Sequence, residues 1–192
     1  MFNDLSSPAA LMATRRSGKP RDMGAPGPTQ AQLDRILDAA IRVPDHGKLA
    51  PWRFVVIPKD RRAAFAELLE AAYREERPDP GKVELAAVHD FAMQGEALVV
   101  ALSAPAHASH IPIWEQELSA GAACMNLLVA AHAEGLVGGW LTGWAAYSDR
   151  VRDAFGERGE RIAGFLFLGT PTRPLEERPR PDRDAVVRIW QG

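Results

Sequence analysis

The fold of this chain is organised around one stretch, Arg42-Val43-Pro44-Asp45-His46-Gly47-Lys48-Leu49-Ala50-Pro51-Trp52-Arg53-Phe54-Val55-Val56-Ile57. A helix is predicted before it, because Thr29 and Gln32 form a capping-box pair and apolar residues then recur at helical spacing. Pro44 disfavours the α conformation at the preceding residue, so this helix should end near Arg42. The apolar end of the stretch predicts a buried strand. A polar turn with a carboxylate, an imidazole and cations therefore sits on a rigid frame, a common way to hold a ligand.

The rest of the chain alternates between helical and strand patterns. Asp60 is expected to cap the second long helix. Further helices are predicted at 8–14, 82–93, 115–134 and 148–156, and strands at 97–102, 137–141 and 162–168. Residues 18–28 and 104–112 are predicted loops, 171–181 an extended segment, and 184–190 a last strand or short helix. Apolar strands interspersed with helices predict a covered sheet and a layered mixed α/β fold.

Length and composition narrow the possible classes of protein. At 192 residues, the chain is expected to be one domain (1–192) with a C-terminal arm from about 171. Its net charge of −2 lacks the basic excess that is typical of proteins that bind nucleic acids or membrane surfaces. The single cysteine, Cys124, cannot form an intramolecular disulfide, which favours a reducing compartment. No run is apolar enough to span a bilayer and no signal peptide is visible, so the cytoplasm is the expected location.

Four segments together resemble the nitroreductase family, in its compact, His-containing branch. They are the helix followed by Pro44-Asp45-His46 with Pro51-Trp52, then Arg15-Arg16-Ser17, Trp114-Glu115-Gln116-Glu117-Leu118-Ser119-Ala120-Gly121, and Gly164-Phe165-Leu166-Phe167-Leu168-Gly169-Thr170-Pro171. The resemblance implies bound FMN, NAD(P)H as electron donor and an intertwined homodimer. It also implies an α+β sandwich whose central sheet is mixed but mainly antiparallel and is flanked by helices.

The triplet Arg15-Arg16-Ser17 offers two guanidinium groups and a hydroxyl. By itself it would be a solvated basic turn after a helix. In the resembled family the corresponding triplet binds FMN, through contacts to the phosphate and to the ring edge. Arginine suits both contacts because it stays charged and bonds bidentately.

The resemblance also implies flavin contacts from Arg42 and His46, with His46 reaching the flavin bound mainly by the other subunit. Without it, Arg42 is a cation favoured by a helix C-terminus and His46 an ordinary turn histidine. The segment Trp140-Leu141-Thr142 corresponds to one that runs past the flavin and offers backbone contacts. Relatives often carry Arg where Leu141 stands, so no charged contact is expected there.

The C-terminal arm carries Arg180 and Arg183 among acidic residues. Many nitroreductases place a basic residue here on the FMN phosphate, and Arg183 is the candidate, against a solvated mixed-charge tail. His107 and His110 have metal-like spacing but lack a third ligand, so no metal is expected. Small residues at 119–123 predict close packing of a helix, either inside one subunit or, as the resemblance favours, at the dimer core.

The resulting hypothesis is an FMN-dependent NAD(P)H oxidoreductase that reduces nitroaromatic or quinone-like acceptors. Because the flavin carries the chemistry, no side chain is assigned as an acid–base catalyst. Enone reduction and reductive dehalogenation on the same scaffold remain alternatives. So do a non-catalytic flavoprotein that stores or senses FMN and a structural dimer with an empty pocket.

Overall fold

The computed structural model describes all residues from 1 to 192. Its helices are α1 (Pro8–Thr14), α2 (Gln30–Ala40), α3 (Arg62–Glu76), α4 (Lys82–Met93), α5 (Ile113–Ala133), α6 (Asp149–Asp153) and α7 (Arg183–Val186). Its strands are β1 (Met23–Gly24), β2 (Trp52–Ile57), β3 (Ala97–Ser103), β4 (Val137–Leu141) and β5 (Arg161–Pro171). Short 3₁₀ turns lie at Pro20–Asp22, His46–Lys48, Lys59–Arg61 and Trp144–Ala146.

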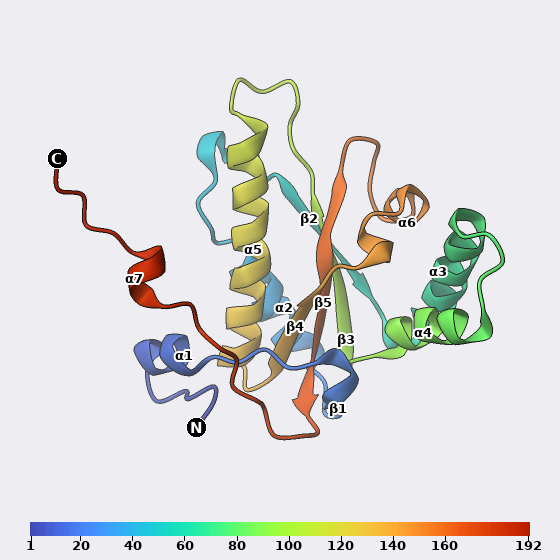
Figure 1. The fold of residues 1–192 in the computed structure, drawn as a ribbon, viewed down its shortest axis with the longest axis horizontal. Helices are drawn as coiled ribbons and strands as arrows, with labels where there is room; N and C mark the ends of the chain where they lie inside the picture. Colours follow the sequence, from blue (N-terminus) through green and yellow to red (C-terminus); the bar gives the residue numbers. More distant parts are fainter.

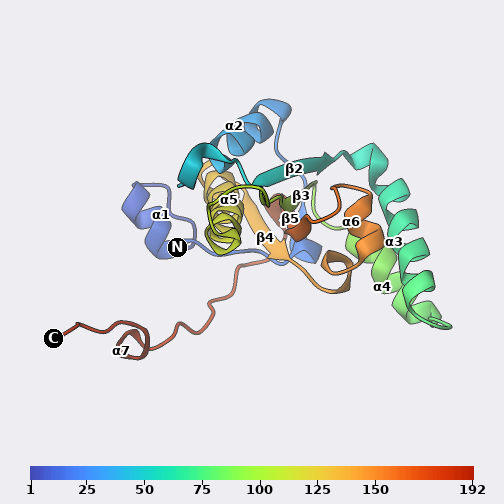
Figure 2. The same cartoon turned by 90° about the horizontal axis from the view of Figure 1, so that it is seen from above.

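The five strands form one sheet in which β5 is central. β3 and β4 flank β5, β2 pairs with β3, and β1 pairs with the end of β5. All of these pairings are antiparallel, so the expected mainly antiparallel α+β layering is confirmed. Figure 1 shows the sheet between α5 on one side and the α3–α4 hairpin on the other, and Figure 2 shows α1, α2 and α5 together on one face.

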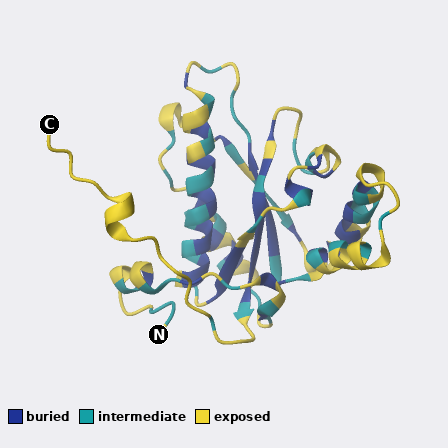
Figure 3. Cartoon of the chain, viewed as in Figure 1, coloured by how far each residue is buried: buried dark blue, intermediate teal, exposed yellow.

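Both faces of the sheet are buried, as the continuous apolar strands predict. On β5, Phe165 and Phe167 belong to the core under α3 and α4, whereas Leu166 and Leu168 belong to the core under α2 and α5. The alternation follows from the two-residue period of a strand. Figure 3 shows the buried sheet and the exposed end of the C-terminal arm, which extends away from the body.

Several predicted element bounds match the structure. The capping box of Thr29 and Gln32 starts α2, Ser148 caps α6, and helix 82–93 and strand 137–141 have the predicted bounds. Gly135 follows α5 with a positive φ of 82°, as expected of a residue just past a helix end.

Other predicted bounds are wrong. Asp60 does not cap α3: it lies inside a 3₁₀ turn, and α3 begins at Arg62. The reason is the buried Arg62 side chain, which donates to the carbonyl oxygens of Ala92 and Gln94 at 2.8 and 2.9 Å and so fixes where the helix enters. The predicted loop 18–28 contains the 3₁₀ turn Pro20–Asp22 and β1, which forms because its partner, the end of β5, continues past Leu168.

The helix ends also differ slightly. α2 stops at Ala40, before Arg42, and α6 stops at Asp153, before Gly156. The segment after β5 is extended until α7, so the short-helix alternative predicted for 184–190 is confirmed at its start, while residues 187–190 form neither helix nor strand. No helix has the length and apolarity needed to cross a membrane.

Candidate functional site

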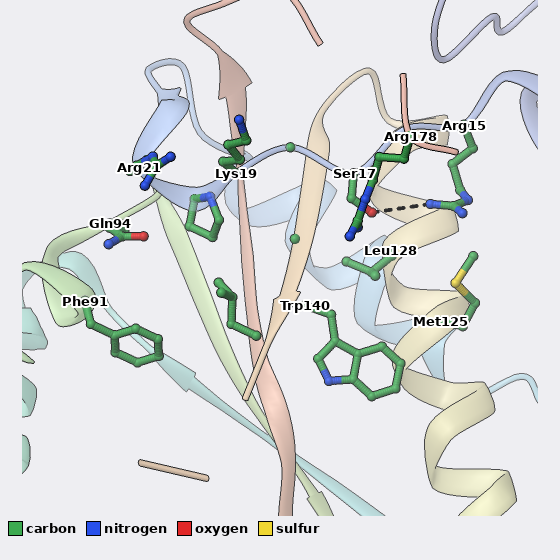
Figure 4. A pocket seen from close by; sticks show the side chains of 14 residues that line it. Arg15, Ser17, Lys19, Arg21, Phe91, Gln94, Met125, Leu128, Trp140 and Arg178 are labelled. Carbon is green, nitrogen blue, oxygen red and sulfur yellow. Dashed lines mark hydrogen bonds between the residues drawn. The ribbon is translucent and has the colours of Figure 1, made fainter. Parts of the chain in front are cut away.

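A cavity of about 540 Å³ lies along β4, at the edge of the sheet. It is lined from the segment after α1, the end of α4, the middle of α5, β4 and the start of the arm (Figure 4). The lining residues are Arg15, Ser17, Gly18, Lys19, Pro20, Arg21, Phe91, Gln94, Met125, Leu128, Gly139, Trp140, Leu141 and Arg178. Its volume is that of a typical cofactor or small-molecule site.

The backbone of segment 15–18 is held by hydrogen bonds at three of its four residues. The amide of Arg15 donates to Leu11 at 2.8 Å and that of Gly18 donates to the Gly138 carbonyl at 3.1 Å. The Arg16 amide donates to the Asn3 side chain at 2.8 Å. The segment is therefore pre-organised by contacts from three parts of the chain.

This segment leaves α1 in an extended conformation at Arg15, so successive side chains point to opposite sides. Arg15 and Ser17 face the cavity, with 3.4 Å between a guanidinium nitrogen of Arg15 and the Ser17 hydroxyl (Figure 4). Burial lowers the pKa of Arg15, and the positive charges of Arg180 and Arg16 lower it further. Because these surroundings disfavour the positive charge of Arg15, a bound anion in this cavity would be stabilised by it.

Arg16 points the other way and does not line the cavity. Its side chain is buried, its Nε donates to the Glu176 carbonyl at 3.1 Å, and a terminal nitrogen forms an ion pair with Glu177 at 2.9 Å. Its guanidinium also lies 5.7 Å from the centre of the Phe2 ring. Within the chain, Arg16 thus holds the C-terminal arm against the body.

β4 supplies the floor of the cavity. A Cβ atom on Gly139 would lie 2.8 Å from the Gly18 carbonyl oxygen, so glycine is needed for the segment after α1 to approach the strand. The Trp140 indole lies against the neighbouring strand β5 and donates to the Ala163 carbonyl at 3.0 Å. Trp140 and Leu141 line the cavity, whereas Thr142 lines a neighbouring one.

Three basic residues that the sequence analysis did not single out complete the site. Lys19 and Arg21 lie at one end of the cavity with Gln94, and Arg178 lies at the other with Arg15 and Ser17 (Figure 4). Arg183 is exposed in α7, outside the lining, and its nearest acidic partner is its own neighbour Asp184 at 3.9 Å. The basic residues after position 172 indicate both Arg178 and Arg183 as possible ligands of an anion. The sequence does not show which of the two lies at the cavity.

Arg42 and His46 do not line this cavity. His46 Nδ1 is 2.7 Å from the Glu115 carboxylate in the first turn of α5, while the cavity is lined by Met125 and Leu128, farther along that helix. The loop is held there by the Asp45 carboxylate, which accepts from the amides of Leu49 and Ala50. From Glu115 to His132, which contacts Arg16, α5 rises roughly 26 Å at 1.5 Å per residue. One chain therefore does not bring His46 and Arg15 to the same cavity.

No three histidine, cysteine, aspartate or glutamate side chains gather as a metal site. His107, one of the two metal-spaced histidines, instead approaches the Gly159 carbonyl at 3.4 Å.

Comparison with known proteins agrees with this architecture. The model of the nitroreductase family matches residues 12–170. The chain belongs to the nitroreductase family. It is 39% identical over 163 residues to a protein of Escherichia coli (strain K12) named "Putative NAD(P)H nitroreductase YdjA", covering 84% of this chain and 86% of that one.

Solved structures of nitroreductases share the fold. A nitroreductase-like family protein from Bacillus cereus superposes with a TM-score of 0.83 at 22% identity, covering 97% of both chains. A nitroreductase with bound FMN from Bacteroides fragilis superposes with a TM-score of 0.68 at 15% identity, covering 94% of this chain and 96% of that one. This family consists of oxidoreductases.

Proposed function

We propose that the protein is an FMN-dependent NAD(P)H oxidoreductase that reduces nitroaromatic or quinone-like acceptors. The observation that carries the proposal is the cavity along β4, which combines an apolar strand and helix wall with four basic side chains in a member of this family. The name of the Escherichia coli relative and the FMN bound to the Bacteroides fragilis structure support the same choice of donor and cofactor.

The residues present fit FMN. The molecule has two anionic features, its phosphate and, after reduction, one edge of its ring. The cavity has basic groups at two ends (Figure 4), so we assign Arg15, Ser17 and Arg178 to the phosphate and Lys19 and Arg21 to the ring edge. The backbone of Trp140, Leu141 and Thr142 would then run past the ring, and Arg16 would act by fixing the arm that carries Arg178 and Arg180.

The bound flavin would supply the redox chemistry, passing two electrons from NAD(P)H to the acceptor. A nitro group that receives two electrons and two protons loses one oxygen as water and becomes a nitroso group, while NAD(P)H becomes NAD(P)⁺. The chain's own residues bind, orient and balance charge. The hydride of NAD(P)H supplies one of these hydrogens together with the two electrons. Because no cavity side chain is assigned to proton transfer, the second proton comes from water.

We further propose that the active unit is a homodimer with two shared flavin sites. His46, at the far end of α5 from Arg15, and Arg42, whose carbonyl oxygen lies 3.4 Å from the Asn126 side chain of the same helix, would reach the flavin of the other subunit. The C-terminal arm supports this arrangement. Its apolar side chains Ile189 and Trp190 are 85% and 88% exposed in one chain, and a second subunit would cover them. Arg183 could meet a phosphate only through such an arrangement.

The proposal also places the enzyme in the cytoplasm, where NAD(P)H is available and the lone Cys124 stays reduced. Two measurements test the function. Purified protein should be yellow and release FMN on denaturation, identified by chromatography. Stopped-flow mixing with NADH and with NADPH should then bleach the flavin within seconds. FAD as the released species, or a flavin inert to both nucleotides, would contradict the proposed enzyme, and inertness would favour FMN storage.

A further inference from the structure

Arg62, the first residue of α3, is a buried cation outside the cavity, only 2% exposed. Its Nη1 atom donates to the carbonyl oxygens of Ala92 and Gln94 at 2.8 and 2.9 Å, and its Nε donates to that of Ile57 at 3.3 Å. The remaining nitrogen, Nη2, is buried and has no acceptor in the protein. Backbone carbonyl groups are therefore the only hydrogen-bond partners of this guanidinium.

The charge of Arg62 has no carboxylate in an ion pair with it, whereas Arg16, the other buried arginine, pairs with Glu177 at 2.9 Å. Burial lowers the pKa of Arg62 to about 10, and the negative charge of Glu96, which pairs with Lys59, opposes this lowering. The guanidinium is therefore charged at neutral pH. A buried charge without an ionic partner is costly, and the N-terminal end of a helix disfavours a cation further. Such a position indicates a functional role.

The carbonyl groups that Arg62 binds lie at the wall of the first cavity. The last turn of α4 carries Phe91 and is followed by Gln94, and both side chains line that cavity (Figure 4). Gln94 lies with Lys19 and Arg21 at the end assigned above to the flavin ring edge. The C-terminal end of a helix carries about half an elementary negative charge. Without a cation, the end of α4 would therefore repel the anionic edge of a reduced flavin.

We propose that Arg62 is a positioning residue of the flavin site, which neutralises the carbonyl end of α4 and thereby favours the anionic reduced form of FMN over the oxidised form. The inference rests on the proposed function. Arg62 does not line the cavity and acts through the backbone of Ala92 and Gln94 and through its weakly screened charge. Its role differs from that of Arg15, because the charge of the FMN phosphate does not change on reduction.

The test compares the affinities of the protein for oxidised and for reduced FMN. Arg62→Met removes the charge at similar size, and Arg62→Gln removes it but keeps a donor for one carbonyl, in case the first variant does not fold. Either variant should weaken the binding of reduced FMN about tenfold more than that of oxidised FMN, which lowers the two-electron midpoint potential of the bound flavin by about 30 mV. Titration with oxidised FMN and potentiometry of the loaded protein measure the two affinities.

Four further variants separate charge from packing. Arg62→Lys keeps the charge and should change the ratio of the two affinities by less than about threefold. Arg74→Met removes an exposed charge from the same helix, and Leu69→Ala weakens the core under α3 without a change of charge, so neither should move the potential. Arg15→Ala should weaken the binding of both oxidation states alike.

Wild-type potentials in Arg62→Met and Arg62→Gln would overturn the inference while leaving the flavoenzyme intact. The same would follow if these variants lost oxidised FMN as strongly as reduced FMN, or if Leu69→Ala lowered the potential equally, because Arg62 would then act through packing alone. A wild-type protein that binds no FMN would instead contradict the proposed function.

Discussion

The Nε2 atom of His132 lies 2.8 Å from the backbone carbonyl oxygen of Arg16. With the proton on Nε2, this buried histidine in the last turn of α5 donates to the segment that carries Arg15 and Ser17. The other ring nitrogen faces the Leu128 carbonyl of its own helix. A contact between residues 116 positions apart thus fixes the backbone of the proposed phosphate site relative to the helix that lines the cavity.

Loss of this contact should weaken both folding and FMN binding. His132→Leu leaves the Arg16 carbonyl without a buried donor, which should cost about 1–3 kcal/mol of unfolding free energy. FMN affinity should fall as well, because the segment 15–18 loses one of its anchors. Urea unfolding of the FMN-free protein and FMN titration measure the two effects. Wild-type values for both would show that the other anchors suffice.

The same histidine should make stability depend on pH. Burial holds the pKa of His132 below its ordinary value of 6.5, so the neutral ring is the native form. The unfolded chain then binds a proton at a higher pH than the folded one. The stabilisation is complete above about pH 6.5 and is lost as the pH falls below it.

A non-titrating replacement separates this effect from that of other acidic groups. His132→Gln keeps a donor but cannot be protonated, so the stability difference between wild type and variant should shrink from pH 7.5 to pH 5. Urea midpoints across this range, for the FMN-free proteins, provide the measurement. Two parallel curves would mean that His132 keeps its ordinary pKa in the folded state.

The two arginines of the triplet should respond differently to truncation. Arg15→Ala removes a charged contact from the cavity and should cost on the order of 1.5–3 kcal/mol of FMN affinity, with little change in the stability of the FMN-free protein. Arg16→Ala should instead lower that stability by about 1–2 kcal/mol, because a buried side chain and its bond to the arm are lost.

Thermal unfolding without FMN and FMN titration separate the two roles, with the exposed Arg158→Ala as control. If Arg16→Ala weakened FMN binding while leaving the melting temperature unchanged, its buried position against the arm would not describe the active protein.

The outward face of α5 should be a dimer contact. In the run 119–123, Ser119, Ala120 and Ala123 are buried in their own chain, but a Cβ atom added to Gly121 would meet no atom within 4 Å. Gly121→Leu therefore fits the single chain and should clash only across an interface. Light scattering should show monomers with reduced FMN content, while Ala86→Leu on α4 stays dimeric. A dimeric, FMN-loaded Gly121→Leu protein would place the interface elsewhere.

The sequence predicted those elements whose signals are local. The capping box of Thr29 and Gln32 and the bounds of α4 and β4 depend on nearby residues, and the structure has them as predicted. The start of α3 depends on Arg62, whose side chain reaches carbonyls 30 residues away, and β1 exists only because the end of β5 lies beside it. Such contacts leave no local pattern.

The same distinction applies to the site. The resemblance identified the triplet, but the opposite orientations of Arg15 and Arg16 follow from the extended backbone after α1, which a two-residue alternation could have indicated. Lys19, Arg21 and Arg178 look like solvated cations in sequence. The packing of the segment after α1 against β4 brings Lys19 and Arg21 to the cavity, and the return of the arm across the body brings Arg178 there.

The central claim is that one flavin is shared by Arg15 of one subunit and His46 of the other. A mixing experiment tests it most directly. Arg15→Ala subunits and Arg42→Ala/His46→Ala subunits, each defective in FMN binding alone, carry different affinity tags so that heterodimers can be isolated.

In a shared arrangement the heterodimer collects both lesions in one site and leaves the other site intact. FMN binding should therefore recover to one flavin per heterodimer, with wild-type affinity. Heterodimers that form but bind no flavin would show that Arg15 and His46 serve the same site within one subunit, and the shared-site account would be wrong.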